Sequence, residues 1–199
     1  MIITKTPLRI SFFGGGSDYP SWYKKKNNFG EVLSCTIDKY IYISIEKRRD
    51  KFIKINSFDY NQIFKFNIKK KLAIKGNLKL VKAIINYLKP YRYGFNLSIH
   101  CDAPTGSGLG TSGCLGSLLI KMLYIYKKKK VSNSKVGELA LLIERDLVKI
   151  NGGKQDQYAG MYGGFNILRF KKRYKCKQKK IVLSRSFIDE LNYNSLLIY

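Results

Sequence analysis

The alternation of hydrophobic and polar positions predicts several β-strands in this chain. Three of them lie in its first third and one near its middle: Lys39–Glu46, Phe52–Phe58, Gln62–Ile68 and residues 95–101. Asp59–Asn61 has the composition of a turn, which predicts that the second and third strands form a hairpin. His100, the only histidine, falls on the polar face of the last strand, where a structural role is favoured over a catalytic one.

Hydrophobic residues recur at helical spacing in three other segments. The first is Leu78–Leu88, which Pro90 ends. The second and third are marked by two sets of residues: Leu115, Leu118, Leu119, Met122, Leu123 and Tyr126, then Val136, Leu139, Ala140, Ile143 and Leu147. Strands and helices alternate irregularly, which predicts an α+β sandwich with helices on one side of a mainly antiparallel sheet.

The chain of 199 residues, 45% of them hydrophobic, suffices for one core, or for one domain and the beginning of another. Its longest uncharged apolar stretch, around Leu115–Ile120, is too short to span a bilayer. The N-terminus lacks the features of a secretion signal, so we expect a cytoplasmic protein with no membrane partner. The four cysteines are far apart and form no CxxC pair, which favours buried thiols over a zinc site or disulfides.

The chain is strongly basic, with 38 Lys and Arg residues against 13 acids and a formal charge of +25. Such a charge attracts nucleic acid or anionic substrates. The lysines, with runs at Lys24–Lys26, Lys69–Lys71 and Lys127–Lys130, are nevertheless scattered among many Ile, Asn and Tyr residues. An AT-rich genome that fills solvated positions with lysine would give the same pattern, so both interpretations stay open.

A glycine-rich segment, PTGSGLGTSG at residues 104–113, joins a predicted strand to a predicted helix. Glycines let the backbone approach a phosphate, and the free N–H groups of the first helical turn point at the anion. Thr111 follows Gly110 where a Walker A loop needs lysine, and the acid of a Rossmann site is missing from the later KKKKVSNSK. A turn that only permits tight helix–sheet packing is the structural alternative.

This segment resembles the second motif of the GHMP kinases, the superfamily of galactokinase, homoserine kinase, mevalonate kinase and phosphomevalonate kinase. TPLRISFFGGGSDYP at residues 6–20 resembles the first motif, and IERDLVKINGGKQDQYAGMYGGFN at residues 143–166 resembles the region of the catalytic aspartate. The first and last stretches are most similar to the D-glycero-D-manno-heptose 7-phosphate kinase branch, with fucokinase-type sugar kinases nearby.

The resemblance implies the GHMP kinase N-terminal domain, a ribosomal-protein-like two-layer sandwich, over residues 1–170. Residues 171–199 are then expected to be a connecting segment and the start of a C-terminal domain. No third glycine-rich motif of the family is visible before the chain stops at NYNSLLIY. On this interpretation the chain is the N-terminal half of a kinase, and at this length it would bind ATP weakly with little or no turnover.

The resemblance also implies a role for individual residues. The ATP phosphates would be held by the motif residues Pro104, Gly106, Ser107, Gly108, Leu109, Gly110, Thr111 and Ser112, and Mg²⁺ by Ser112 and Glu144. Asp156 would be the catalytic base, with Arg9 beside it as a fixed cation. The structural alternatives are a surface charge or an ion pair with Arg145 for Glu144, an edge-strand charge for Arg9 and a turn residue for Asp156.

In the family, the segment after the first-motif strand lines the sugar pocket. Gly14, Gly15 and Gly16 would bring bare backbone to the sugar, and Ser17 and Asp18 would bind its hydroxyls. Galactokinase-like relatives carry a Glu-His pair where this chain has Gly15-Gly16. The pocket should therefore be roomier and less charged, which would suit a larger, phosphorylated sugar.

The function implied is an ATP-dependent sugar kinase that phosphorylates the anomeric hydroxyl of D-glycero-D-manno-heptose 7-phosphate, for synthesis of a nucleotide-activated heptose. A fucokinase-like or other sugar kinase is the nearest alternative. A basic RNA-binding module of the same fold is the alternative of another class, although no clustered basic-aromatic signature supports it. A non-catalytic remnant that binds a partner is a third, and the oligomeric state stays open.

Overall fold

The computed structural model describes residues 1–23, 29–89, 93–104, 106–171 and 175–198. Its strands are β1 (Ile2–Phe13), β2 (Gly30–Lys47), β3 (Phe52–Ser57), β4 (Gln62–Asn67), β5 (Phe95–Cys101), β6 (Phe165–Phe170) and β7 (Cys176–Ile181). Its helices are α1 (Pro20–Tyr23), α2 (Lys79–Leu88), α3 (Thr111–Tyr126), α4 (Asn133–Leu141), the π-helix η1 (Leu142–Leu147), α5 (Asp156–Tyr162) and α6 (Arg185–Tyr193).

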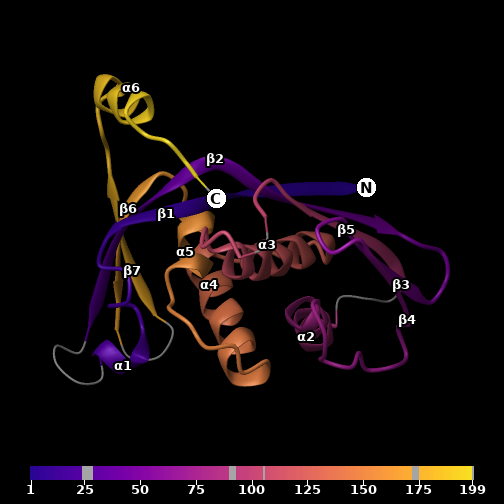
Figure 1. The fold of residues 1–199 in the computed structure, drawn as a ribbon. Coiled ribbons are helices and arrows are strands. Elements are labelled where there is room, and N and C mark those ends of the chain that lie inside the picture. The colour runs from indigo at the N-terminus through magenta and orange to yellow at the C-terminus, as the bar shows by residue number, and fades with distance from the viewer. Residues whose placement is uncertain (24–28, 90–92, 105, 172–174, 199) are drawn as a thin grey trace.

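The 18-residue strand β2 is the centre of the sheet, whose strand order is β4-β3-β5-β2-β6-β7 with β1 also paired to β2. β1 runs antiparallel to β2 along nearly its whole length. On the opposite edge of β2, β5 pairs with Ile41–Lys47 and β6 pairs with Gly30–Cys35. β2 therefore joins two halves of the sheet, which diverge from it in Figure 1. Among the described strands, only β3 and β5 pair in parallel.

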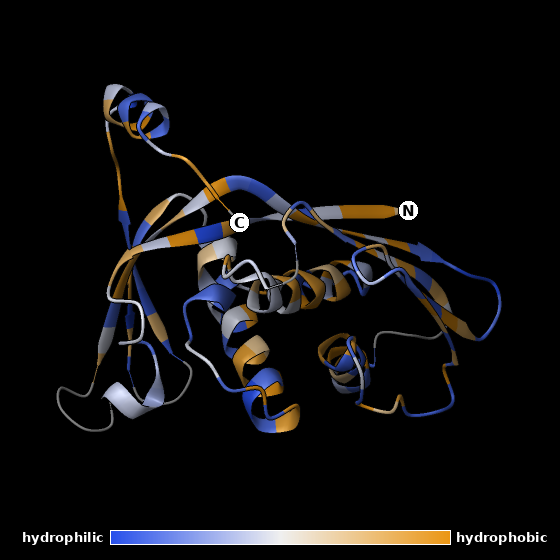
Figure 2. Cartoon of the chain, in the orientation of Figure 1, coloured by the Kyte–Doolittle hydropathy of each residue, from blue (hydrophilic) through white to orange (hydrophobic). Residues whose placement is uncertain are grey.

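The helices α2, α3, α4 and α5 cover one face of this sheet, as Figure 1 shows. The core lies between the two layers and takes its side chains from the alternating inward positions of the strands and from the helices. α3 is buried along most of its length, whereas α2 carries hydrophobic residues on one side and hydrophilic ones on the other (Figure 2). The α+β sandwich predicted from the sequence is thus confirmed.

The predicted elements agree with the structure where their hydrophobic pattern is clean. The hairpin is confirmed as β3 and β4, which pair from Phe52↔Asn67 to Ser57↔Gln62. The predicted helix at 78–88 is α2, and the predicted strand at 39–46 is the second half of the longer β2.

The predicted helix from Val136 to Leu147 is not a single α-helix. After α4 the chain makes the π turn η1, in which the Val148 amide bonds to the Ile143 carbonyl. The extra residue of this turn rotates the residues after it by about 100° around the helix, so Leu147, which the spacing predicts to be buried, is 46% exposed. This π turn carries Glu144 and Arg145, both of which contact the candidate site.

Several other predictions concern the surface and the chain ends. The expected domain boundary after residue 170 falls between β6 and β7, which pair antiparallel in the same sheet.

The cysteines are free thiols, three of them buried and Cys176 half-buried. The lysine run Lys24–Lys26 lies outside the described residues. Within the described ranges, no helix combines the length and apolarity that crossing a membrane requires.

Candidate active site

Arg9 and Asp156 form an ion pair although 147 residues separate them in sequence. Arg9 lies on β1 and Asp156 is the first residue of α5. The Arg9 Nε and Nη2 atoms lie 2.7 and 2.6 Å from Asp156 Oδ1, and Arg9 Nη1 donates to the Gly108 carbonyl at 2.8 Å. One guanidinium therefore joins the candidate base to the glycine-rich loop.

The side chain of Asp156 packs against the start of α3 because two glycines leave room for it. A Cβ at Gly110 would lie 2.9 Å from Asp156 Cγ, and one at Gly113 would lie 2.5 Å from Asp156 Cβ. Gly110 also has φ of +78°, a left-handed conformation that favours glycine. The glycines of the loop thus bring the candidate base against the beginning of the helix.

The N-terminus of the 16-residue helix α3 is free to bind an anion. Its N-cap is Gly110, which has no side chain to cap it, and among the described residues the amides of Thr111, Ser112 and Gly113 have no acceptor. Gly106 and Gly108 also have positive φ and no atom within 4 Å of a built Cβ. Unpaired amides and exposed glycines at a helix N-terminus suit a phosphate group.

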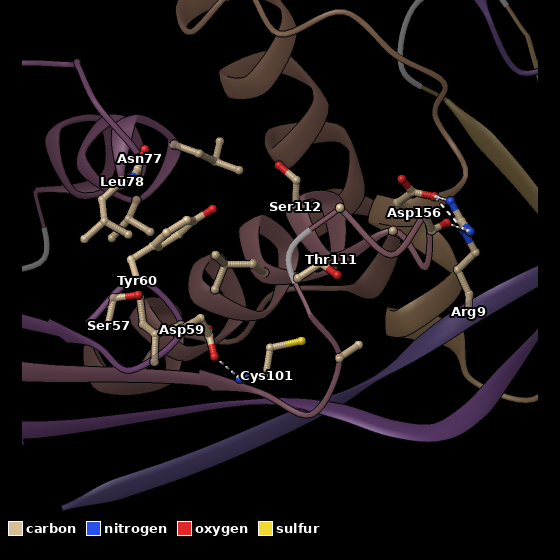
Figure 3. Close-up of a pocket in the computed structure, with 18 residues that line it drawn as sticks. Arg9, Ser57, Asp59, Tyr60, Asn77, Leu78, Cys101, Thr111, Ser112 and Asp156 are labelled. Atoms are coloured by element: carbon tan, nitrogen blue, oxygen red, sulfur yellow. Dashed lines mark hydrogen bonds and ion pairs between the residues drawn. The ribbon is translucent and has the colours of Figure 1, made fainter. Parts of the chain in front are cut away.

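A cavity of about 380 Å³ extends from this loop across β5 to α2 and the β3–β4 turn. Figure 3 shows the Arg9–Asp156 pair at one end of it and Tyr60 and Leu78 at the other, with Ser112 between them. Most of the far end is apolar, with a few polar groups among the lining residues Ser57, Asp59, Tyr60, Asn77, Leu78, Leu80, Val81 and Leu115.

Two serine hydroxyls next to the cavity have no partner among the described residues. Ser57 Oγ and Ser107 Oγ are buried atoms without a hydrogen bond, and Ser57 lines the cavity. Buried polar atoms are normally paired, so an orphaned hydroxyl in a cavity wall indicates a ligand or water partner. The cavity has the volume and the mixed lining of a small-molecule site.

Ser112 and Glu144 are brought together, as the family resemblance implies. Ser112 Oγ lies 3.4 Å from Glu144 Oε1, while Gln157 Nε2 bonds to Glu144 Oε2. Glu144 is only 3% exposed, and burial raises the pKa of its carboxyl while Arg145 and the Gln157 hydrogen bond oppose this. A hydroxyl and a carboxylate oxygen at this separation are ligands that Mg²⁺ accepts when phosphate oxygens and water complete its shell.

The electrostatics of Asp156 combine burial with several nearby charges. Burial raises the pKa of its carboxyl, and the Arg9 guanidinium acts in the opposite direction through its charge and its hydrogen bond. Asp18 raises this pKa slightly further and Arg145 lowers it. The Asp156 side chain is 26% exposed, and its carboxyl is held by the Arg9 cation. A carboxyl in this environment is suited to exchanging a proton with a neighbouring group.

The predicted sugar-binding residues lie outside the lining of this cavity. Gly15 and Gly16 are open, with no atom within 4 Å of a built Cβ, whereas a Cβ on Gly14 would lie 2.0 Å from the Glu31 carbonyl oxygen. Ser17 Oγ donates to that same carbonyl at 2.7 Å. The first glycine therefore permits the loop to cross β2 closely, and only the next two expose backbone. Asp18 is fully buried. Its expected role as a sugar ligand stays a prediction.

Sequence reasoning missed three residues of the site. Gln157 holds Glu144, Arg145 holds the loop before Asp156, and Tyr60 lines the far end of the cavity. Arg145 and Gln157 adjoin residues that the motifs single out, so their position beside Glu144 and Asp156 was the available signal. Nothing local marks Tyr60, because only the fold of the β3–β4 hairpin brings it to the cavity.

Comparisons with known proteins agree with this geometry. Residues 78–164 match the family described as GHMP kinases N terminal domain. The chain is 33% identical over 204 residues to the D-glycero-alpha-D-manno-heptose 7-phosphate kinase of Campylobacter jejuni, with 100% of this chain and 59% of that protein covered. It is 26% identical to the bifunctional fucokinase/GDP-fucose pyrophosphorylase of Arabidopsis thaliana, covering 97% of this chain and 19% of that protein.

Solved structures give the same result. A crystal structure described as "a D-glycero-D-manno-heptose 1-phosphate kinase from Bacteriodes thetaiotaomicron" superposes with a TM-score of 0.88 at 32% identity, covering 96% of this chain and 63% of that one. Mevalonate kinase from Methanococcus jannaschii shares the fold, with a TM-score of 0.74 at 21% identity, covering 92% of this chain and 56% of that one. The chain thus spans roughly three fifths of the length of these two heptose phosphate kinases. Given these matches and this site, the chain is similar over its whole length to kinases of the GHMP superfamily, and residues 78–164 match the N-terminal domain of that family.

Proposed function

We propose that this protein takes part in ATP-dependent phosphorylation of a sugar phosphate, with D-glycero-D-manno-heptose 7-phosphate as acceptor at its anomeric hydroxyl. The observation that carries the proposal is the placement of Asp156 against a helix N-terminus whose first amides have no acceptor in the described parts of the chain. A group that can accept a proton thus lies beside a group that can bind a phosphate. Phosphoryl transfer requires this combination of positioning and charge compensation.

In the proposed reaction, Asp156 accepts the proton of the acceptor hydroxyl as that oxygen bonds to the γ-phosphorus of ATP. The bond between the γ-phosphorus and its bridging oxygen breaks, and ADP leaves. Residues 106–112, with the α3 amides, hold the phosphates, and the Arg9 guanidinium orients the Asp156 carboxylate. The apolar end of the cavity near Leu78 and Tyr60 is suited to the nucleoside.

Ser112 and Glu144 would hold Mg²⁺ together with phosphate oxygens, and bound Mg²⁺ would neutralise phosphate charge. This chain offers no Walker-type lysine in the loop, so a cation from outside the loop is required for that charge. A cytoplasmic location, where ATP is supplied, is part of the same proposal.

The choice of acceptor is supported by the heptose 7-phosphate kinase at 33% identity and by the open backbone at Gly15 and Gly16. The bulky or charged side chains that galactokinase-like relatives carry there are missing. The relative described as a heptose 1-phosphate kinase, at 32% identity, supports the class of heptose phosphates but not this particular acceptor. A fucokinase-like activity remains the alternative acceptor class, because a fucokinase is among the relatives.

Because little or no turnover is expected at this length, the test and the kinetic comparisons below use the chain extended to the full length of its heptose phosphate kinase relatives. Phosphoryl transfer from ATP to heptose 7-phosphate is followed by ³¹P NMR, with fucose and galactose as competing acceptors. We expect a new anomeric phosphate only with the heptose. ATP should also raise the melting temperature, because a ligand at 100 times its Kd adds about 2.7 kcal/mol of stability. Salt-sensitive RNA binding without protection by ATP would contradict the proposal and favour the RNA-binding module.

Replacing Arg9 by glutamine is expected to move the acid limb of the kcat–pH profile upward by about one pH unit or more. The Arg9 charge lowers the pKa of Asp156, so its removal raises that pKa, and the base is then protonated at a higher pH. Asp18 and Arg145 also influence this carboxyl and stay unchanged in the variant. Arg9→Lys keeps the charge and should shift the limb less. An unmoved limb in Arg9→Gln would show that another group titrates.

A further inference from the structure

One peptide group in the loop before α5 is held from both sides by charged side chains. The Gly153 carbonyl accepts a hydrogen bond from Arg145 Nη2, and the adjoining Lys154 amide donates to Asp18 Oδ2 at 2.7 Å. In a trans peptide the C=O and the N–H point in opposite directions. Asp18 and Arg145 therefore approach the chain from opposite sides, two residues before Asp156.

Both carboxylate oxygens of Asp18 accept hydrogen bonds from backbone amides. Besides Lys154, the Gln155 amide donates to Oδ2 at 3.1 Å, and the Gly16 amide donates to Oδ1 at 3.2 Å. The residue is 0% exposed. An ionised carboxylate with several amide donors is well satisfied when buried, and these charge-assisted bonds are stronger than neutral ones.

Arg145 holds the carbonyl side of the same loop. Its Nη1 donates to the Ile150 carbonyl and its Nη2 to the Gly153 carbonyl, so one guanidinium fixes two carbonyls in this turn. The π turn η1 that carries Arg145 also places Glu144 beside Ser112. The loop before α5 is thereby tied to the element that would hold the metal ion.

The loop has room for these contacts only because of its glycines. A Cβ on Gly153 would lie 2.0 Å from Asp18 Oδ2, and one on Gly152 would lie 2.8 Å from Arg145 Nη2. Substitution at either position would push one of the two charged groups away. The Gly152-Gly153 pair is thus explained by the side chains that close on it.

We propose that Asp18 and Arg145 are positioning residues of the phosphoryl-transfer reaction. Together they fix the main chain of residues 150–155, and this sets where Asp156 stands relative to Arg9 and the glycine-rich loop. Asp18 acts through the loop and not as a ligand of the sugar, because its oxygens are buried and already bonded. The inference rests on the proposed function, which supplies the reaction that Asp156 serves.

The experiment compares Asp18→Ala, Asp18→Asn and Arg145→Lys with the unmodified chain in steady-state kinetics. For Asp18→Ala we expect kcat to fall about a hundredfold, since a displacement of about 1 Å at a reacting group costs that much, while both KM values stay within about threefold. Asp18→Asn keeps one oxygen for the Lys154 and Gln155 amides and should retain an intermediate kcat. Lysine cannot reach two carbonyls as a guanidinium does, so Arg145→Lys should also lower kcat.

Amide hydrogen exchange gives a second readout that does not depend on activity. The Lys154 and Gln155 amides should exchange at least about tenfold faster in Asp18→Ala, because they lose their acceptor. The exposed ion pair of Arg185 and Asp189 in α6 supplies matched controls, Arg185→Lys and Asp189→Ala, which should change neither readout. If Asp18→Ala fails to fold, Asp18→Asn and Arg145→Lys still carry the comparison.

The outcomes separate the two proposals. A large rise in the acceptor KM of Asp18→Asn with an unchanged kcat would overturn the inference and make Asp18 a sugar ligand. Unchanged exchange at Lys154 and Gln155 in Asp18→Ala would show that Asp18 does not hold the loop. No transfer by the chain extended to the full length of its heptose phosphate kinase relatives would overturn the proposed function and the catalytic part of this inference, while faster exchange would still establish that Asp18 holds the loop.

Discussion

Replacing Asp156 by asparagine is expected to lower kcat by about a hundredfold to ten-thousandfold, the usual contribution of a positioned general base. Asparagine has nearly the same shape and keeps an oxygen that can accept the Arg9 hydrogen bonds, so the loop should stay in place. It cannot accept the proton of the hydroxyl at neutral pH. The affinity for ATP, measured by equilibrium binding, should therefore change little.

Two controls belong with this variant. Asp189→Asn removes an exposed carboxylate in α6 and should leave kcat unchanged. Thermal melting tests whether Asp156→Asn folds, because the Arg9 guanidinium, 12% exposed, loses its counter-ion. Turnover close to that of the unmodified chain would show that Asp156 is not the base, and the proposed reaction would then need another proton acceptor.

Gly110→Ala is expected to have the second largest effect and to affect both substrates. The new Cβ would lie 2.9 Å from Asp156 Cγ and 3.1 Å from Arg9 Nε, so either the ion pair or the loop must move. We expect kcat to fall by about a hundredfold or more, because misplacement by about 1 Å has this cost. The KM for ATP should rise as well, since Gly110 is the N-cap of the helix whose amides would bind phosphate.

Gly164→Ala is the matched control for this variant. Gly164 has φ of +70°, close to the +78° of Gly110, but no atom lies within 4 Å of its built Cβ. Both substitutions impose the strain of a left-handed conformation, about 1–2 kcal/mol. Equal losses of melting temperature with a loss of activity in Gly110→Ala alone would assign that loss to the contact. Equal losses of activity would instead assign it to destabilisation.

The parts of the fold that the sequence predicted are those with a strong local pattern. Five elements have a regular hydrophobic pattern in the sequence, either alternation in a strand or helical spacing in a helix, and the structure contains all of them: β3, β4, β5, α2 and α3. β7 was not predicted, because its sequence CKQKKI is mostly polar and it forms a strand by pairing with β6. The π turn was missed because the hydrophobic spacing from Val136 to Ile143 fits an ordinary α-helix, and only the exposed Leu147 departs from it.

Only those residues of the site that belong to the sequence motifs could be predicted. The structure brings together Arg9 with Asp156 and Ser112 with Glu144, two pairs that the family resemblance implied. It gives Asp18 a different environment from the one expected, because burial depends on how the loop after β1 folds back on residues 153–155. Contacts between segments so far apart in sequence are set by the sheet and leave no local signal.

The long strand β2 also governs the order in which the site can assemble during folding. It is synthesised early, but β5 and β6, its partners on one edge, come much later in the chain. Pairing across such distances is slow, because a long loop must close first. The glycine-rich turn can dock once β5 has joined the sheet, whereas Asp156 reaches that turn only after α5 has been synthesised and has packed against α3 and the Arg9 side chain of β1. A nascent chain therefore forms its glycine-rich turn before Asp156 can pair with Arg9 beside that turn.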